Sequence, residues 1–395
     1  MKTTIPASDY NPLAGAVIDD PYPYYRVLRA EHPVHHNREL DLWTLSRFAD
    51  VQMAARDWGT FSSVEGVVLD NGLTLLEQLK PGNVLVSDPP QHDVVRKVVH
   101  RQFTPAHVKA VEHAAERDAA ELIDRLLDAR DVDLAVDLGW PLPTAAIAAV
   151  LGLPAVDVPW LTLLLLDYLD GEPDSSLLPE RSLAAARQLC DYVAEQLGDR
   201  RRHARDDLLS AMVAAESAGQ IHAEESLGLA FVLLTAGIDT TAALIMAAIE
   251  LLAPRPAARA RLIAEPTALA PCIEEVVRYA SPLQGLARTT TADVELHGVT
   301  IPQGARVWLA FGAANRDAAR FPDADVFDPF RSPLRNLGFG EGIHHCIGAP
   351  LARLVGRVAL EQFLLRVASV TVSSCGVRLY NHAVRSWASL PAVVE

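Results

Sequence analysis

The sequence is poor in cysteine and in positive charge, and each shortage excludes a class of protein. Four cysteines among 395 residues are widely separated and form no Cys-x-x-Cys pair, which excludes a disulfide scaffold and a zinc ribbon. Lysine and arginine total 35 against 50 aspartates and glutamates, so the net charge of −15 disfavours general affinity for nucleic acid or anionic membranes. We therefore expect a cytoplasmic protein that binds neither.

We also expect no secretory signal, because residues 1–15 contain one lysine and no apolar core. One apolar run is long enough to span a bilayer: from Leu227 to Ile249 the only charged residue is Asp239. A central aspartate is costly in lipid, and neither flank carries a cluster of basic anchors. A helix buried at the centre of a large protein is also apolar on all sides. We predict such a buried helix.

Helical periodicity dominates the sequence, and strand-like alternation is confined to short pieces. Hydrophobic residues make up 50% of the chain, which is enough for a large core. No repeat, low-complexity segment or Gly/Ser-rich linker marks a boundary, so we predict one domain over residues 1–395, mainly α with small β-sheets. Helices are predicted at 21–30, 107–127, 140–151, 181–201, 206–215, 223–252, 268–279 and 351–367, and strands within 35–45, 291–309 and 370–379.

A glycine-rich loop around Cys346 carries the strongest chemical signal. Residues 339–348 read Phe-Gly-Glu-Gly-Ile-His-His-Cys-Ile-Gly, and these glycines allow a tight backbone that can approach a flat ligand closely. Pro350 follows in the first turn of a predicted helix. The helix N-terminus favours a thiolate over a thiol and can donate N–H groups to the sulfur. A thiolate so placed is a suitable axial ligand for haem iron.

Two other interpretations of this loop remain open at this point. His344, His345 and Cys346 could hold zinc, although contiguous residues seldom supply three ligands to one tetrahedral ion. Cys346 could also be an ordinary buried thiol.

The pattern Phe-x-x-Gly-x-His-x-Cys-x-Gly, formed by Phe339, Gly342, His344, Cys346 and Gly348, resembles the haem-binding signature of the cytochrome P450 superfamily. Further segments that resemble landmarks of this family follow in the right order across nearly the whole chain. The resemblance implies a soluble bacterial-type cytochrome P450, in which haem b lies between a long central helix and the loop of the cysteine ligand. It also implies that Cys346 binds the iron and that Phe339, His344 and Gly348 contact the haem.

The second landmark is Ala236-Gly237-Ile238-Asp239-Thr240, inside the long apolar run. Buried polar groups are costly unless they are satisfied or functional. The resemblance implies that Ala236 and Gly237 lie against the haem, and that Asp239 and Thr240 serve O2 binding and proton delivery. The alternative is a threonine that bonds back to the carbonyl one turn earlier and only bends the helix.

The third landmark is the pair Glu275 and Arg278, which share one helix face. Such a pair alone is usually a solvated surface pair. The segment 327–331, Phe-Asp-Pro-Phe-Arg, resembles the family segment that supplies a second arginine, Arg331, to Glu275. The resemblance implies a structural network and no catalytic role.

The fourth landmark places His92 and Arg96 four residues apart on one face of a starting helix, an arrangement that can grip an anion. The resemblance implies that they bind a haem propionate, and that Arg288 and His344 make the other propionate contacts. Without the resemblance, each would be more typical of the surface.

The function that the resemblance implies is that of an oxidoreductase, a haem-thiolate monooxygenase. It would insert one oxygen atom of O2 into a small organic substrate by hydroxylation or oxidative dealkylation, with electrons from NAD(P)H through a reductase and a separate ferredoxin. We expect a monomer. Two alternatives are a haem-thiolate peroxygenase or coupling enzyme, and a non-catalytic haem-binding sensor. The Asp239–Thr240 pair argues against peroxide use, and no DNA-binding or signalling segment supports the sensor.

Pocket and docking residues are predicted by the same resemblance. The loop 63–73 contains no lysine or arginine, and the other expected pocket segments are apolar or acidic, so we expect a neutral, mainly hydrophobic substrate of modest size. Basic residues around the cysteine loop suggest docking of an acidic ferredoxin. The expected pocket residues are Leu233, Ala236, Leu283 and Leu286, and the expected docking residues are Lys97, Arg101, Lys109, Arg353 and Arg357.

Overall fold

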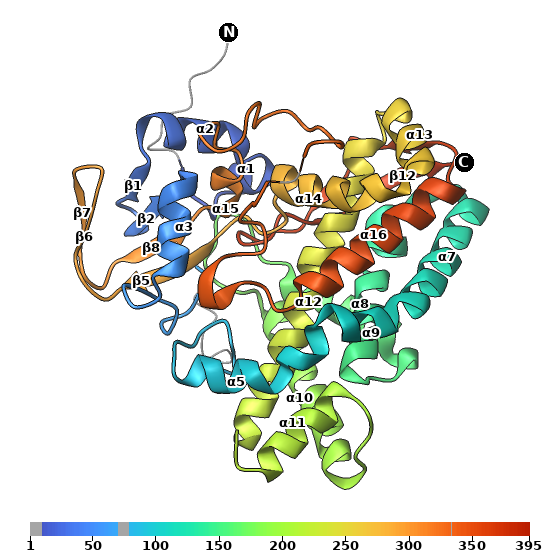
Figure 1. Ribbon diagram of the computed structural model, residues 1–395, viewed down its shortest axis with the longest axis horizontal. Helices are drawn as coiled ribbons and strands as arrows, with labels where there is room; N and C mark the ends of the chain where they lie inside the picture. The colour runs from blue at the N-terminus through green and yellow to red at the C-terminus, as the bar shows by residue number, and fades with distance from the viewer. Residues whose placement is uncertain (1–9, 70–78, 333) are drawn as a thin grey trace.

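The computed structural model describes residues 10–69, 79–332 and 334–395, and helices dominate it (Figure 1). The predicted fold class, mainly α with small β-sheets, is confirmed. The helices are α1 (Gly15–Asp19), α2 (Tyr22–Glu31), α3 (Phe48–Arg56), α5 (Gln91–His100), α6 (Pro105–Val108), α7 (Glu112–Ala129), α8 (Pro141–Leu151), α9 (Val158–Leu169), α10 (Glu180–Arg202), α11 (Leu208–Ser217), α12 (Ala223–Leu252), α13 (Pro256–Ala264), α14 (Leu269–Ala280), α15 (Phe311–Ala314) and α16 (Ala349–Arg366).

The strands are short and lie in four sheets of the described chain. Their bounds are β1 (Val34–Asn37), β2 (Leu42–Leu45), β3 (Phe61–Ser62), β4 (Asp131–Asp133), β5 (Leu286–Thr290), β6 (Val294–Leu296), β7 (Val299–Ile301), β8 (Arg306–Leu309), β9 (Val370–Val372), β10 (Val377–Arg378), β11 (Trp387–Ser389) and β12 (Pro391–Val394). The largest sheet has the order β1-β2-β8-β5-β3, with β2 and β8 parallel and the other pairs antiparallel.

Helix α12 runs through the centre of the molecule (Figure 1) and packs against α8, α10, α14 and α16. It is long and apolar enough to cross a membrane, but 83% of its most apolar window is buried inside the protein. The core helix of a soluble protein has the same properties. The predicted burial of the run from Leu227 to Ile249 is therefore confirmed.

Strand β5 brings a chemically important residue from the largest sheet toward this central helix. The chain enters β5 through Gly285, where a Cβ atom would lie 2.3 Å from the buried ring of Trp308 in β8. Only glycine fits this close approach without a shift of the tryptophan. Arg288, two residues into the strand, is thereby held in the interior, where it is 3% exposed.

The observed elements differ from the predicted ones where periodicity carries no information. Helix α7 begins at Glu112 and not at His107, because α6 and a 3-10 turn at Lys109–Val111 precede it. The predicted strand segment 35–45 is a hairpin of β1 and β2, with Asp41 in the left-handed region at φ 47°. Helix α9 was not predicted, because its sequence is apolar on every side and shows no period.

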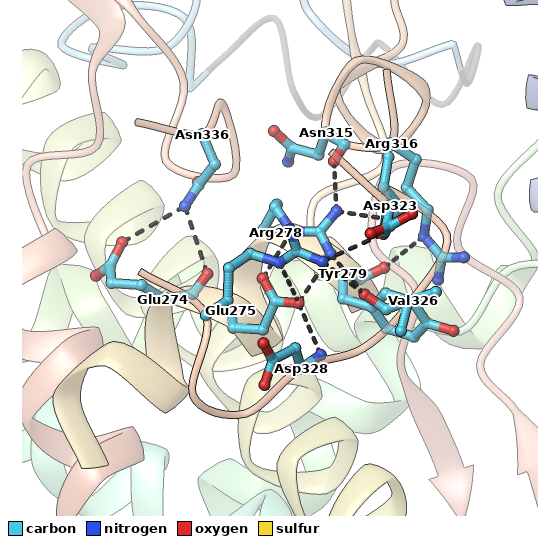
Figure 2. Close-up of polar contacts among 12 residues, drawn as sticks. Glu274, Glu275, Arg278, Tyr279, Asn315, Arg316, Asp323, Val326, Asp328 and Asn336 are labelled. Atoms are coloured by element: carbon cyan, nitrogen blue, oxygen red, sulfur yellow. Dashed lines mark hydrogen bonds and ion pairs between the residues drawn. The ribbon is translucent and has the colours of Figure 1, made fainter. Parts of the chain in front are cut away.

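Helix α14 carries the predicted glutamate–arginine network, and the structure shows its contacts (Figure 2). The two oxygens of Glu275 accept from Nε and Nη2 of Arg278 at 2.7 and 2.8 Å, and Oε1 also accepts from Nε of Arg331 at 3.1 Å. The remaining donors of Arg278 bind the backbone oxygens of Asn315, Ala324 and Val326. Glu275 and Arg278 are 3% and 2% exposed, so this is a buried, fully bonded ion pair.

The substitution Glu275→Gln should lower the free energy of unfolding by about 3–5 kcal/mol, because it leaves the charge of Arg278 buried without a counter-ion. Urea unfolding of the purified holoenzyme, followed by circular dichroism, measures the change. The matched control is Glu265→Gln, since Glu265 pairs with Arg261 on the surface and is about half exposed. Its loss should cost less than about 1 kcal/mol. Equal losses in the two variants would contradict a structural role for the buried network.

Candidate functional site

A cavity of about 390 Å³ brings together most of the predicted site residues. Helix α12 forms one wall, the cysteine loop and the start of α16 form another, and the segment from Pro282 to Arg288 forms a third. The predicted residues that line the cavity are Arg96, Leu233, Ala236, Gly237, Asp239, Thr240, Leu283, Leu286, Arg288, Phe339, His344, Cys346 and Gly348. The structure therefore unites four sequence segments that were singled out separately.

Two groups of predicted residues lie outside this wall. His92 is buried behind His344, with 4.9 Å between the ring centroids. Glu275, Arg278 and Arg331 belong to the network below the cysteine loop and do not reach the cavity. Of the loop 63–73, residues 70–73 lie outside the described residues, whereas Gly66, Val67 and Val68 line the cavity.

The cysteine loop has the tight backbone that its glycines predict. Gly340 and Gly342 adopt φ of 71° and 69°, and a Cβ atom on Gly342 would lie 2.7 Å from the carbonyl oxygen of Ala55. The backbone N–H of Cys346 donates to the carbonyl of Phe339 at 2.8 Å, which closes the loop. Helix α16 begins at Ala349, so Cys346 stands just before its N-terminus, as predicted.

Cys346 lines the cavity and is one of the exposed cysteines of the described chain. Burial raises the pKa of this thiol, and the N–H groups of Gly348 and Ala349 and the charge of Arg96 act in the opposite direction. The N–H groups at the start of α16 favour the thiolate, but the net shift of the pKa is upward, opposite to the predicted preference for a thiolate. Within the described residues, no three His, Cys, Asp or Glu side chains converge as a metal site, so the zinc interpretation has no support.

A corner of the cavity concentrates buried nitrogen donors. Burial lowers the pKa of Arg288 to about 10 and that of His344 to about 3. Among the described residues, Arg288 makes one side-chain hydrogen bond, to the carbonyl of Ala287 at 2.8 Å. His92 Nδ1 donates to Asp93 Oδ1 at 2.9 Å, so its buried Nε2, which has no partner among these residues, donates only when the ring is doubly protonated. Arg96 donates to the carbonyl of His345 at 2.6 Å. Buried donors without acceptors are costly, so this corner is suited to an anionic group.

The cavity wall formed by α12 carries the predicted acid, Asp239, and the predicted alcohol, Thr240. Asp239 is 3% exposed, and burial raises its pKa to about 7. Its Oδ1 has no partner among the described residues. Thr240 faces the cavity, and its Oγ1 donates to the carbonyl of Ala236 at 3.2 Å, which is the local bond that the alternative interpretation expects. A carboxyl group with a pKa near neutrality can both hold and release a proton.

Sequence reasoning missed several residues of the cavity wall. The segment 380–384 near the C-terminus lines the cavity, and its Asn381 donates to Asp239 Oδ2 at 3.2 Å. No motif marks this segment, because it reaches the site only through contacts between segments that are distant in sequence. Lys80 and Glu172 place two opposite charges on the wall, and Lys80 corrects the expectation that the pocket segments are apolar or acidic.

Comparison with known proteins agrees with this geometry. The family model Cytochrome P450 matches residues 184–371. Cytochrome P450 130 of Mycobacterium tuberculosis is 35% identical over 391 residues, which cover 94% of each chain. The mycinamicin IV hydroxylase/epoxidase of Micromonospora griseorubida is 35% identical over 334 residues, covering 84% of this chain and 83% of that protein.

The fold is shared with solved structures as well. CYP109E1 from Bacillus megaterium, in complex with testosterone, superposes with a TM-score of 0.87 at 30% identity, covering 96% of this chain and 98% of that chain. Such identity along nearly the whole length, together with the same fold, shows that this chain is an enzyme that belongs to the cytochrome P450 family of monooxygenases.

Proposed function

We propose that residues 1–395 form one haem domain that inserts an oxygen atom from O2 into a hydrophobic organic molecule, with Cys346 as the iron ligand. The observation that carries the proposal is one cavity lined by Cys346, by Asp239 and Thr240 of α12, and by the buried Arg288. Thiolate ligation of haem iron favours O–O cleavage. The reaction sends one oxygen atom into the substrate and the other into water, which consumes two electrons and two protons.

The described residues fit haem b. Arg288, which makes one side-chain hydrogen bond among the described residues, would supply donors to the propionates, as would a doubly protonated His92 through Nε2, with Arg96 and His344 beside them. Ala236 brings only a methyl group to the cavity wall, which would leave room for a flat ring beside it, whereas a Cβ on Gly237 would lie 3.3 Å from Ile147 of α8. When bound, haem supplies the site of O2 reduction. Phe339 and Gly348 border the same space from the cysteine side.

The residues of this chain then control protons and water. Asp239 holds a proton at a carboxyl whose pKa is about 7, so both its forms are populated near neutral pH. Thr240 Oγ1 lies one residue further along α12 and can exchange its bond to Ala236 for a bond to an oxygen species in the cavity. The apolar wall excludes bulk water, so protons reach the reaction through these two groups.

The substrate is proposed to be neutral and mainly hydrophobic. Leu233, Leu283, Leu286, Val67 and Val68 all face the cavity, beside small Ala236. Arg96 and Arg288 on the wall are proposed to pair with the haem propionates. The charges of Lys80 and Glu172 are of opposite sign, so these two together give the substrate no net preference for an ion. An unpaired charged substrate would lose its hydration without compensation.

The electron donor is proposed to be a separate ferredoxin, reduced from NAD(P)H by a reductase, that docks on a cytoplasmic monomer. Arg353 pairs with Glu274 and Arg357 pairs with Glu112, so these two predicted docking cations are largely neutralised. The other three lie on segments that precede α7, and they are exposed without an ion pair among the described residues: Lys97, Arg101 and Lys109. An acidic protein is steered more strongly toward such uncompensated charges.

Replacing the proposed ligand tests the assignment of the haem. Cys346→Ser should abolish the red-shifted Soret band that reduced, CO-bound thiolate-ligated haem gives, because a serine hydroxyl is a far weaker ligand. The matched control is Cys375→Ser, since Cys375 is exposed and far from the loop in sequence, and its spectrum should equal that of the original protein. An unchanged CO spectrum in Cys346→Ser would refute the assignment.

Replacing the proposed proton-delivery groups tests the chemistry. Thr240→Ala should retain haem but divert NADH electrons to hydrogen peroxide, and Asp239→Asn should slow turnover, because each removes a step of the proton path. Product and peroxide formed per NADH are measured with a surrogate ferredoxin and reductase. If product per NADH is unaltered in both variants, the proton-delivery roles are wrong. Undiminished turnover driven by added peroxide alone would favour the peroxygenase alternative.

A titration tests the substrate class. For matched pairs of a carboxylic acid and its methyl ester, the ester should produce the low- to high-spin absorbance change at the lower concentration, because the cavity wall is mainly apolar. If the acid binds more tightly and loses that advantage in Lys80→Gln, the substrate is an anion bound through Lys80. That result would overturn the proposal of a neutral substrate.

A further inference from the structure

The carboxyl group of Asp239 depends on a single side chain from a distant part of the sequence. Asn381 Nδ2 donates to Asp239 Oδ2 at 3.2 Å, whereas Oδ1 has no partner among the described residues. The two residues are 142 positions apart, and both border the cavity. Asn381 thus supplies the one hydrogen bond found for this carboxyl group.

The amide of Asn381 can make that donation in only one orientation. Its Oδ1 accepts from the backbone N–H groups of Ala383 at 2.9 Å and Val384 at 3.1 Å. A flipped amide would oppose its NH2 group to these two donors and turn its oxygen toward Asp239. The loop backbone therefore fixes the NH2 group on the carboxyl.

The loop that carries Asn381 is tied to three other parts of the cavity wall. The carbonyl of Ala383 accepts from Gln284 N–H at 2.7 Å, beside the pocket leucine Leu283. His382 Nε2 accepts from Leu69 N–H at 2.9 Å, in the segment that also contains Val67 and Val68. Tyr380 N–H donates to Asp170 Oδ1 at 3.1 Å, at the end of α9.

From these contacts we infer that Asn381 is a positioning residue for proton delivery: it orients the Asp239 carboxyl and links it to the wall that contacts substrate. The inference rests on the proposed proton-delivery role of Asp239. A substrate that contacts the 380–384 loop contacts the segment that carries Asn381. Among the described residues, Asn381 is the only hydrogen-bond partner found for the Asp239 carboxyl group. Proton delivery is thereby made sensitive to occupancy of the cavity.

The hydrogen bond from Asn381 also affects the pKa of the Asp239 carboxyl group. A donor to a carboxylate oxygen stabilises the ionised form, so Asn381 opposes the rise in the pKa of Asp239 that burial causes. No charged side chain is among the causes of that rise, and burial lowers the pKa of the adjacent His382 to about 4, which leaves it neutral. Removal of the NH2 group should therefore raise the pKa of Asp239.

The decisive variant is Asn381→Asp. It keeps an oxygen for the N–H groups of Ala383 and Val384 but puts a second carboxyl where the NH2 group stood. Two carboxyls in contact share a proton, so the upper titration of the pair should lie about one unit or more above that of Asp239 in the original protein. Infrared difference spectra of the carboxyl C=O stretch across pH measure this titration, and Asp239→Asn identifies the band. The alkaline limb of product formed per NADH should shift in the same direction.

A matched control loosens the same loop elsewhere. Asp170→Ala removes the acceptor of Tyr380 N–H without touching the contact of Asn381 with Asp239, and the Asp239 band should titrate as in the original protein. An equal shift in this control would mean that loop displacement is the cause, which overturns the inference.

The outcomes also separate this inference from the proposed function. If Asp239→Asn lowers product per NADH while Asn381→Asp leaves the titration unchanged, the positioning role alone is wrong. If Asp239→Asn leaves product per NADH unchanged, the proton-delivery role of Asp239 fails, and the inference fails with it.

Discussion

The position of the cysteine loop depends on one buried guanidinium, that of Arg278. All five of its N–H donors are bonded, two to Glu275 and three to backbone oxygens of the 315–326 segment (Figure 2). Asn315 in turn accepts from the N–H of Leu337 at 2.7 Å, immediately before the loop. A chain of bonds therefore runs from α14 to the loop backbone, and it lets an irregular segment hold a fixed shape.

The same helix supports the loop by direct packing. A Cβ atom on Gly338 would lie 2.3 Å from Cγ1 of Val277, so only glycine allows the loop to approach α14 this closely. Arg353 of α16 pairs with Glu274 at 2.5 Å and stacks on the ring of Phe339 at 4.2 Å. Helix α14 therefore supports the loop that carries Cys346.

Two buried arginines differ in how many of their N–H donors are hydrogen-bonded within the protein, and this difference separates a structural from a ligand-binding role. Arg278 and Arg288 are 2% and 3% exposed, yet Arg278 uses five donors within the protein and Arg288 uses one. Leaving buried donors unsatisfied costs free energy, so the first arrangement stabilises the fold by itself. The second is expected where an anionic ligand completes the bonding, and in this proposal that ligand is a haem propionate.

The sequence predicted the parts of the site that lie within one loop or helix, and it did not predict the parts that depend on contacts between distant segments. Cys346, Asp239 and Glu275 stand in local patterns with family-specific spacing, and each pattern lies within one loop or helix. The long apolar run also predicted a buried α12 correctly. Asn381 and the hairpin turn at Asp41 carried no local signal, because the first acts through a contact across the fold and the second depends on a single backbone conformation. Residues that act on the site through contacts across the fold are thus harder to predict from sequence than residues that stand in a local motif.

The energetics of Asp239 explain why such tuning residues matter. A pKa raised to about 7 means that burial disfavours the ionised carboxyl by roughly 4 kcal/mol relative to water. A fold gains no stability from a carboxyl group in that state, and its placement beside Thr240 on the cavity wall is the one that the proposed proton transfer would use. The free energy of one hydrogen bond from Asn381 is comparable to the free-energy difference between the protonated and the ionised form of Asp239 at neutral pH. A single amide on a loop that borders the substrate can therefore set when this acid gives up its proton.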